Sequence, residues 1–166
     1  MLFRSIYPRL SVYENIRCSL LWSMGYRYNF WRNVAKLRDA NERTERTLEQ
    51  IGMTARRNTP AGVLTYAEQR ALEIGITIAG DSSVILLDEP TAGMSRRETE
   101  GAVELIRSVS RGRTLVIVEH DMGVVFDLAD RISVLVHGEI IATDTPDRIR
   151  ANAAVQAAYL DSDHHA

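Results

Sequence analysis

The stretch Val84-Ile85-Leu86-Leu87-Asp88-Glu89-Pro90 decides the fold, because four apolar residues run without alternation into two adjacent carboxylates. An apolar run of this kind predicts a strand covered on both faces, as in a parallel sheet. Such a strand places the residues that follow it at the carboxyl edge of the sheet, where open α/β folds bind ligands. There Asp88 would help to hold Mg²⁺, and Glu89 would polarise a water molecule that attacks a γ-phosphate. The alternative is a plain acidic turn after a strand, since Pro90 favours an extended backbone at Glu89.

The composition of the 166-residue chain is ordinary for a globular domain, with 45% hydrophobic and 25% charged residues. The formal net charge of -2 gives no general attraction to nucleic acid, so no nucleic-acid partner is expected. No apolar run approaches the roughly 18–20 residues of a membrane span. The single cysteine, Cys18, excludes an internal disulfide and is predicted to be buried, because Leu20 and Leu21 follow it closely. We therefore expect a cytosolic protein.

The first third of the chain is predicted to be helical. Ser11 and Glu14 form a capping box that opens a helix through Trp22. A second helix is expected from about Arg32 to Ile51, and Gly52 would stop it.

After a predicted loop over residues 53–62, helices and strands alternate, which favours βαβ connections and a largely parallel sheet. Two further capping boxes, Thr65 with Glu68 and Ser95 with Glu98, open helices. The expected helices run from Thr65 to near Gly80, from Ser95 through Val109, after Asp121 and from Pro146, and the expected strands are Val84–Asp88, Thr114–Glu119 and a hairpin of Ile132–Val136 with Glu139–Ala142 joined by His137-Gly138.

Two more polar features are expected at the carboxyl edge of the sheet. The helix opened by Thr65 presents free backbone N–H groups and the positive end of its dipole, and the Thr65 hydroxyl adds a donor. These groups can hold an anion, although most capped helices bind nothing. His120 follows the second predicted strand and would contact a γ-phosphate or orient the attacking water, with a structural capping role as the alternative.

In order and text, the segments LTYAEQR (64–70), VILLDEPTAGMS (84–95) and VIVEHDM (116–122) closely resemble the ATP-binding subunits of ABC transporters. The resemblance implies an α/β fold, a P-loop NTPase-like ABC ATPase core with a helical subdomain. It implies ATP and Mg²⁺ as cofactors, with Asp88 as the magnesium-associated acid, Glu89 as the general base and His120 as the γ-phosphate switch.

The resemblance also assigns the nucleotide contacts. Thr65, Tyr66, Ala67 and Glu68 would form the signature motif, in which Thr65 and the backbone of Ala67 touch the γ-phosphate of ATP held by an opposite subunit. Residues 92–95, ending in Ser95, would form the D-loop. The implied assembly is a head-to-tail dimer with a second ABC ATPase subunit.

The subfamily is suggested by a tyrosine inside the signature, by EHDMGVVFDLADRISVLVHGEIIATDTPDRIRAN (119–152) and by VQAAYL (155–160). These segments resemble the importer ATPases for branched-chain amino acids, with urea and amide importers as close rivals. The resemblance runs from about Pro8 to Leu160. It implies integral-membrane permease subunits as partners and a cytoplasmic location, peripheral on the inner face of the plasma membrane.

Two departures from the family pattern limit these implications. Thr65 and Ala67 stand where the signature usually has serine and glycine, although the hydroxyl and the N–H are kept. Lys36 is the only lysine and follows Ala35, so the Gly-Lys pair of a Walker A phosphate loop does not occur in the sequence. We therefore expect an N-terminally truncated, incomplete ATPase core.

In that interpretation, residues 1–63 are part of the helical subdomain, and residues 64–166 are the signature helix and the carboxy-terminal part of the ATPase core. In the family the Walker A strand lies between the strands that correspond to residues 114–119 and 132–136. Without that strand, we expect either a gap between the two strands or their direct pairing.

The expected function is that of an ATP-binding subunit of an ABC importer that couples ATP hydrolysis to transport, with this chain inactive on its own. The alternative is a non-catalytic half-site that complements the nucleotide site of another ABC subunit. A third interpretation is an unrelated α/β protein with a chance Asp-Glu-Pro sequence.

Overall fold

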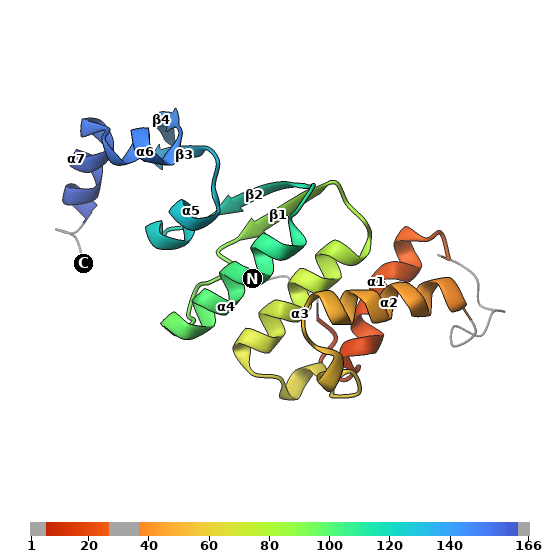
Figure 1. Cartoon of the computed structure of the whole chain (residues 1–166). Helices are drawn as coiled ribbons and strands as arrows, with labels where there is room; N and C mark the ends of the chain where they lie inside the picture. The colour runs from red at the N-terminus through yellow and green to blue at the C-terminus, as the bar shows by residue number, and fades with distance from the viewer. Residues whose placement is uncertain (1–5, 27–36, 163–166) are drawn as a thin grey trace. The chain divides into compact units, whose positions relative to one another are not determined.

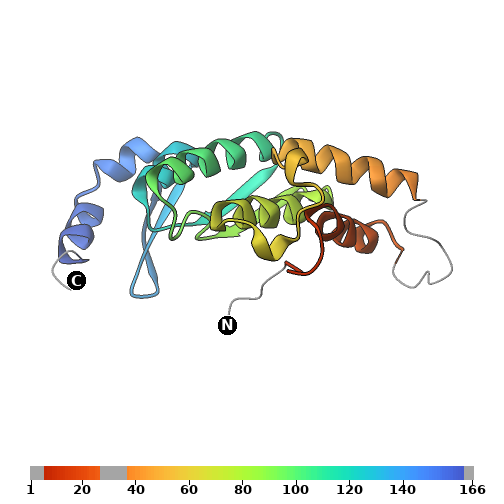
Figure 2. The ribbon, with the colours of Figure 1, turned by 90° about the horizontal axis from the view of Figure 1, so that it is seen from below.

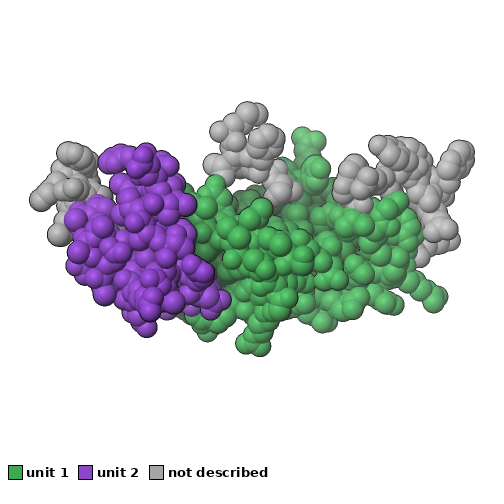
Figure 3. Space-filling view, turned by 90° about the horizontal axis from the view of Figure 1, so that it is seen from above, with its two compact units in different colours: residues 1–118 green, residues 119–166 purple. Residues whose placement is uncertain are grey.

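The computed structural model describes residues 6–26 and 37–162. The chain divides into two compact units, residues 1–118 and 119–166, which Figure 3 shows in different colours. Each unit contains both helices and strands. The division falls after the second strand. The predicted subdomain boundary between residues 63 and 64 lies inside the first unit and stays a prediction.

The first helix, α1 (Val12–Ser23), begins where the capping box predicts. The N–H and the hydroxyl of Ser11 donate to Glu14 Oε2, each at 2.9 Å, and the Glu14 N–H donates to Ser11 Oγ at 3.2 Å. These bonds satisfy backbone donors that the first helical turn cannot satisfy within the helix. Cys18 lies on the exposed side of α1, so the prediction of a buried cysteine is wrong. Nearby protein atoms still remove part of the water around the thiol, and this partial desolvation raises the pKa of Cys18.

The second helix, α2 (Arg38–Gln50), starts later than predicted. Residues 32–36 of the predicted helix lie outside the described residues. Leu37 has an extended backbone (φ −79°, ψ 91°), so the helical prediction is wrong at that position. The predicted stop is confirmed, because Gly52 has a φ of +66°, which glycine adopts at little cost.

Three helices form the main core of the first unit. α1 packs against α2 and against α3 (Tyr66–Ala79), as Figures 1 and 2 show. The buried side chains between them are apolar, apart from Asn15, Thr44 and Thr47. The fully buried members with the largest side chains are Ile16, Leu20, Leu48 and Leu72.

The segment between α2 and α3 is more regular than the predicted loop. It contains two 3₁₀ turns, η2 (Thr54–Arg56) and η3 (Ala61–Val63). The Val12 N–H donates to the Thr59 carbonyl at 3.0 Å, which ties the segment to the start of α1. This hydrogen bond therefore fixes the position of the segment that leads to Thr65.

A βαβ unit follows, as predicted. β1 (Val84–Asp88) and β2 (Thr114–Val118) are parallel, and α4 (Arg96–Val109) connects them. Figure 1 shows the two strands side by side; in the sequence, α4 lies between them. In register, Val84 pairs with Thr114 and Asp88 with Val118. Both strands therefore end at the same edge of the sheet.

The prediction that β1 is covered on both faces is wrong. Ile85 is 1% exposed, whereas its neighbour Leu86 is 69% exposed. The side chains alternate between the two faces of a strand, and the described residues of the first unit cover only the face that carries Ile85. The other face presents a set of exposed apolar side chains: Val84, Leu86, Val116 and Val118.

The second unit contains α5 (Met122–Leu128), an antiparallel hairpin of β3 (Ile132–Val136) and β4 (Glu139–Asp144), α6 (Pro146–Arg150) and α7 (Ala153–Ser162). The predicted hairpin turn is confirmed, since His137 and Gly138 both have positive φ values, +49° and +86°. The core of this unit is a cluster of Ile132, Ile149 and Val155.

β2 and β3 belong to separate two-stranded sheets. They lie in different units, so the two alternatives of a gap and direct pairing both stay predictions.

Candidate functional site

The carboxyl edge of β1 carries the two predicted acids. Asp88 is the last residue of the strand, and the Glu89 N–H donates to the Val118 carbonyl at 2.9 Å, so the ladder to β2 extends one residue further. Glu89 has a φ of +44°, in the left-handed region that non-glycine residues rarely adopt. The extended backbone that Pro90 favours is therefore absent at Glu89. Backbone strain of this kind costs about 1–3 kcal/mol and gathers at functional sites.

The Asp88 carboxylate is exposed and has no hydrogen bond or ion pair with any other described residue. A carboxylate in this state is available to a cation. The described residues contain no cluster of three or more His, Cys, Asp or Glu side chains that could hold a metal ion. Mg²⁺ commonly binds through one or two carboxylates together with phosphate oxygens and water. Asp88 therefore fits a magnesium ion that arrives with a phosphate group.

The start of α3 presents the predicted donors. Thr65 is the N-cap residue, and its Oγ accepts from the Glu68 N–H at 3.3 Å. The Thr65 hydroxyl also interacts with the Glu68 carboxylate, and this contact adds to the lowering of the Glu68 pKa. The N–H groups of Tyr66 and Ala67 have no hydrogen-bond acceptor among the described residues. Two backbone donors therefore remain at the positive end of the helix, which suits an anion.

Glu68 closes the capping box from the other side. Its Oε2 accepts from the Thr65 N–H at 2.9 Å, and its Oε1 forms an ion pair with Arg56 Nε at 2.8 Å. The backbone hydrogen bond from Thr65 and, after it, Arg56 lower the pKa of Glu68 below its ordinary value. An ionised carboxylate cannot donate to a phosphate oxygen, so Glu68 supports the helix start and does not offer a phosphate contact through its side chain.

The turn after β1 lies next to the start of α3. It is folded by the Ala92 N–H donating to the Glu89 carbonyl and the Met94 N–H donating to the Thr91 carbonyl, each at 3.2 Å. A β-carbon added at Gly93 would lie 3.9 Å from Tyr66 Cε1, so the Tyr66 ring borders the turn. The structure thus brings the predicted signature and D-loop residues together within the first unit.

Ser95 and Glu98 are confirmed as a pair at the start of α4. The N–H and the hydroxyl of Ser95 both donate to Glu98 Oε2. The hydroxyl bond from Ser95 and then its backbone bond lower the pKa of Glu98. A phosphate contact through the Ser95 hydroxyl would have to replace this bond.

His120 belongs to the second unit. It is exposed, and its backbone N–H donates to Glu119 Oε2 at 3.2 Å. The neighbouring Asp121 caps α5 by accepting from the N–H groups of Gly123 and Val124, as predicted. The expected position of His120 beside Asp88 and Glu89 stays a prediction.

Sequence reasoning missed Arg56 and Arg70. Arg56 lies twelve residues before Glu68, and no regular spacing signals their ion pair. Arg70 donates from Nε and Nη2 to the Tyr66 hydroxyl, at 3.1 and 2.9 Å, and thereby holds the tyrosine that borders the turn after β1. The spacing of four residues on one helix could have indicated this second contact.

Comparison with known families decides the classification. The family model described as ABC transporter matches residues 2–92, which is more than half of the chain. The chain belongs to the ABC transporter family. A second model, described as branched-chain amino acid ATP-binding cassette transporter, matches residues 139–160.

Curated relatives support the same classification. The high-affinity branched-chain amino acid transport ATP-binding protein LivG of Escherichia coli (strain K12) is 38% identical over 124 residues, covering 74% of this chain and 49% of LivG. The corresponding protein BraF of Pseudomonas aeruginosa is 37% identical over 125 residues, with the same coverage of 74% and 49%. The ribose import ATP-binding protein RbsA of Shigella dysenteriae serotype 1 is 31% identical over 150 residues, covering 90% of this chain and 29% of RbsA. The chain spans about half the length of LivG and BraF.

Solved structures confirm the α/β cassette fold. A nucleotide-free ATP-binding cassette from an ABC transporter aligns with a TM-score of 0.73 at 22% identity, covering 92% of this chain and 63% of that one. A dimeric cassette in a post-hydrolysis state, bound to ADP and Pi, aligns with a TM-score of 0.67 at 21% identity, covering 87% and 61%. Asp88 and Glu89 lie within the residues that the ABC transporter model matches.

Proposed function

We propose that this chain contributes the signature helix, α3, and the acids Asp88 and Glu89 of an ATP-binding subunit that drives solute import. The observation that carries the proposal is the carboxyl edge of β1, where an unpaired Asp88 and a strained Glu89 adjoin a turn that contacts the start of α3. The names of LivG and BraF favour branched-chain amino acids as the solute. The similarity to RbsA, a ribose importer, keeps other small solutes open.

In the proposed reaction, each residue has a separate task. Mg²⁺, when bound, neutralises charge on the phosphates that are separated during hydrolysis. Asp88 would hold this ion, directly or through water. Glu89 would accept a proton from the attacking water molecule as general base. His120 would contact the γ-phosphate.

The start of α3 would act on a second nucleotide. Thr65 would donate its hydroxyl proton, in place of the contact with Glu68, and Ala67 its N–H to the γ-phosphate of ATP held by an opposite subunit. Each ATP site would then be built from two subunits in a head-to-tail arrangement. Tyr66 would position the turn that ends in Ser95, because its ring borders Gly93.

The proposed partners follow from this assembly: a second ABC ATPase subunit and integral-membrane permease subunits. No helix in the described part of the chain is long and apolar enough to cross a bilayer. We place the working subunit in the cytoplasm, on the inner face of the plasma membrane, through those permease partners.

A steady-state ATPase assay tests the catalytic part of the proposal. The 166 residues contain no Gly-Lys pair, so we expect the chain alone to show no turnover of Mg-ATP above background. The Glu89→Gln variant is the matched control, since it removes the proposed base and keeps the shape. Steady turnover that disappears in Glu89→Gln would show that the chain supplies a complete catalytic site.

A non-catalytic half-site is the second candidate, favoured by the Tyr66 and Ala67 N–H groups, which have no acceptor among the described residues. In this role the chain would complete the nucleotide site of another ABC subunit without hydrolysing ATP itself. Association with a full-length homologous subunit should then depend on ATP and be lost in Thr65→Glu, which places a negative charge against the phosphate. Association that ignores ATP or survives in Thr65→Glu would exclude the half-site.

A further inference from the structure

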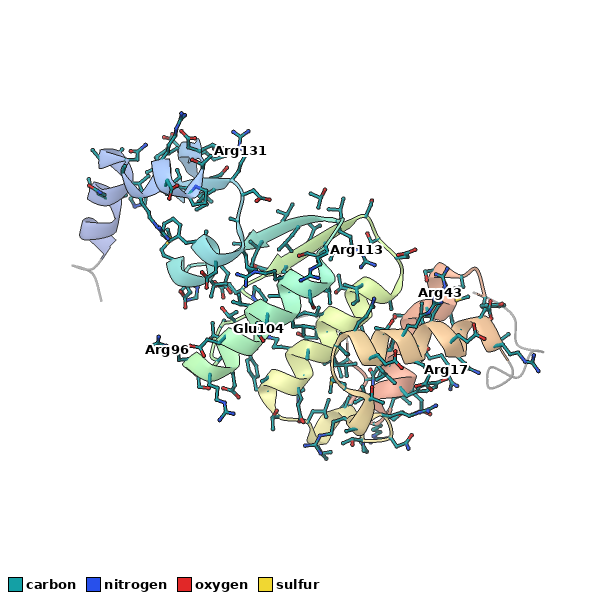
Figure 4. The ribbon with its side chains drawn as sticks, in the orientation of Figure 1. Arg17, Arg43, Arg96, Glu104, Arg113 and Arg131 are labelled. Atoms are coloured by element: carbon teal, nitrogen blue, oxygen red, sulfur yellow. The ribbon has the colours of Figure 1, made fainter. Side chains whose placement is uncertain are left out.

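Four arginines gather at the amino edge of the β1–β2 sheet, away from the site described above. Arg43 and Arg46 lie on α2, and Arg111 and Arg113 lie just before β2; Figure 4 labels Arg43 and Arg113. Two hollows lie among them, with volumes of about 130 Å³ and about 340 Å³. Gln50 and Arg113 line both hollows, so the two adjoin. We refer to them together as the arginine pocket.

The arginine pocket carries an excess of positive charge. Among the described residues that line it, Asp81 is the only acidic one, against four guanidinium groups, and Arg43 also interacts electrostatically with Asp39 on the same helix. Arg43, Arg46 and Arg111 form no ion pair with another described residue. The whole chain, by contrast, has a formal net charge of -2. The positive charge is therefore a property of this pocket and not of the whole surface.

Arg113 is a partly buried member of the set. Its Nη2 makes a long contact of 3.3 Å with Asp81 Oδ1, and its side chain is 20% exposed. Its Nη1 is buried and has no hydrogen-bond partner among the described residues. A buried donor without an acceptor is costly, and a guanidinium group has the geometry to bind an oxyanion through two parallel N–H bonds. Arg113 lines both hollows, so the rest of its guanidinium group is available to an anion there.

The pocket is separate from the proposed nucleotide residues. Arg113 precedes Thr114, the first residue of β2, whereas Asp88 ends the parallel strand β1. A strand of five residues is about 15 Å long, so the two groups lie at opposite edges of the sheet. An anion in the pocket would contact α2 and the segment before β2, and it would lie near the Asp81 carboxylate.

We propose that the arginine pocket binds a phosphate-bearing anion, independently of the nucleotide site. The smaller hollow accepts one phosphate group between Arg43, Arg46 and Arg113, and the larger one accepts a second group beside Arg111. The chemistry is that of a pyrophosphate or of a phosphate ester. A soluble compound and a lipid headgroup share this chemistry.

Calorimetric titration of the chain with inorganic pyrophosphate, at constant ionic strength, tests the proposal. The double variant Arg46→Gln, Arg111→Gln removes two exposed guanidinium groups without disturbing the partly buried Arg113. We expect it to weaken binding about tenfold or more, because each removes a charged hydrogen bond to the anion. Arg9→Gln with Arg97→Gln is the matched control, since both arginines are exposed and neither lines the pocket. It should bind within about twofold of the unaltered chain.

A further variant separates this pocket from the start of α3. Thr65→Val tests the start of α3, and we expect it to weaken pyrophosphate binding less than the arginine double variant does. Binding that falls in Thr65→Val but not in the arginine double variant would place the anion at α3 and overturn the proposal. Circular dichroism of each variant confirms that the fold is retained.

Cosedimentation with vesicles distinguishes the two sources of phosphate. Vesicles of phosphatidylcholine with phosphatidic acid are compared with phosphatidylcholine alone. Cosedimentation that requires phosphatidic acid and is lost in the arginine double variant identifies a lipid headgroup. Pyrophosphate binding without cosedimentation identifies a soluble ligand. Absence of both, or binding that the double variant leaves unchanged, overturns the proposal.

Discussion

Two adjacent residues of β1 offer a direct measure of how the sheet is covered. Ile85 is 1% exposed and Leu86 is 69% exposed. Truncation of a buried isoleucine to alanine costs about 2–5 kcal/mol, from lost apolar burial and the cavity left behind. Full burial of a leucine side chain contributes about 1.5–3 kcal/mol, so less than a third of that, below about 1 kcal/mol, is expected for Leu86. Ile85→Ala should therefore destabilise the chain several times more than Leu86→Ala.

Urea unfolding followed by far-UV circular dichroism measures both costs. Ile85→Val is included as a milder change, expected to cost about 0.5–1.5 kcal/mol, in case the alanine variant does not fold. Measurements at low and high protein concentration add a control. Equal costs for Ile85→Ala and Leu86→Ala would refute the one-sided sheet. A cost at Leu86 that grows with concentration would mean that a second copy of the chain covers the exposed face.

Three further predictions concern α3 and α4. Gly75→Ala should destabilise the chain by about 1–3 kcal/mol, because the added carbon would lie 2.7 Å from Ile51 Cδ1; adding Ile51→Val should recover most of this loss. Gly101→Ala has open space around it and should stabilise the chain by about 0.5–1 kcal/mol in the same urea assay. Thr65→Ala should cost about 1 kcal/mol through loss of the N-cap bond, whereas the serine variant, which keeps the hydroxyl, should melt near the unaltered chain. Because the folded pKa of Glu68 is depressed, its contribution is complete above its ordinary value of 4.5 and is lost as pH falls through the lower folded value. Glu68→Gln should flatten that part of the stability curve, and an unchanged curve between about pH 5 and about pH 3 would contradict the assignment.

Features encoded by a few neighbouring residues were predictable. The capping residues gave the starts of α1, α3 and α4, because each cap satisfies backbone donors only three residues away. The His137-Gly138 turn was predictable for a similar reason, since only certain residues accept positive φ at both positions. The pair of carboxylates at the end of a strand likewise followed from the order of residues alone.

Features that depend on distant parts of the chain were not predictable in the same way. The exposure of Leu86 depends on which layers cover the sheet, and an apolar run carries no information about that. Cys18 has apolar neighbours in sequence, but on a helix these point in other directions, so it faces outward. At Glu89, the hydrogen bond to the Val118 carbonyl and the turn that follows overcome the local preference set by Pro90.

The left-handed backbone at Glu89 also governs how this position should be engineered. A glycine there would relieve the conformational penalty while deleting the carboxylate, so a gain in folding would mask a chemical loss. Asparagine tolerates the same dihedral angles better than most residues but shortens the side chain. Glutamine alone changes the charge and leaves both the length and the main-chain penalty in place, which makes it the informative replacement.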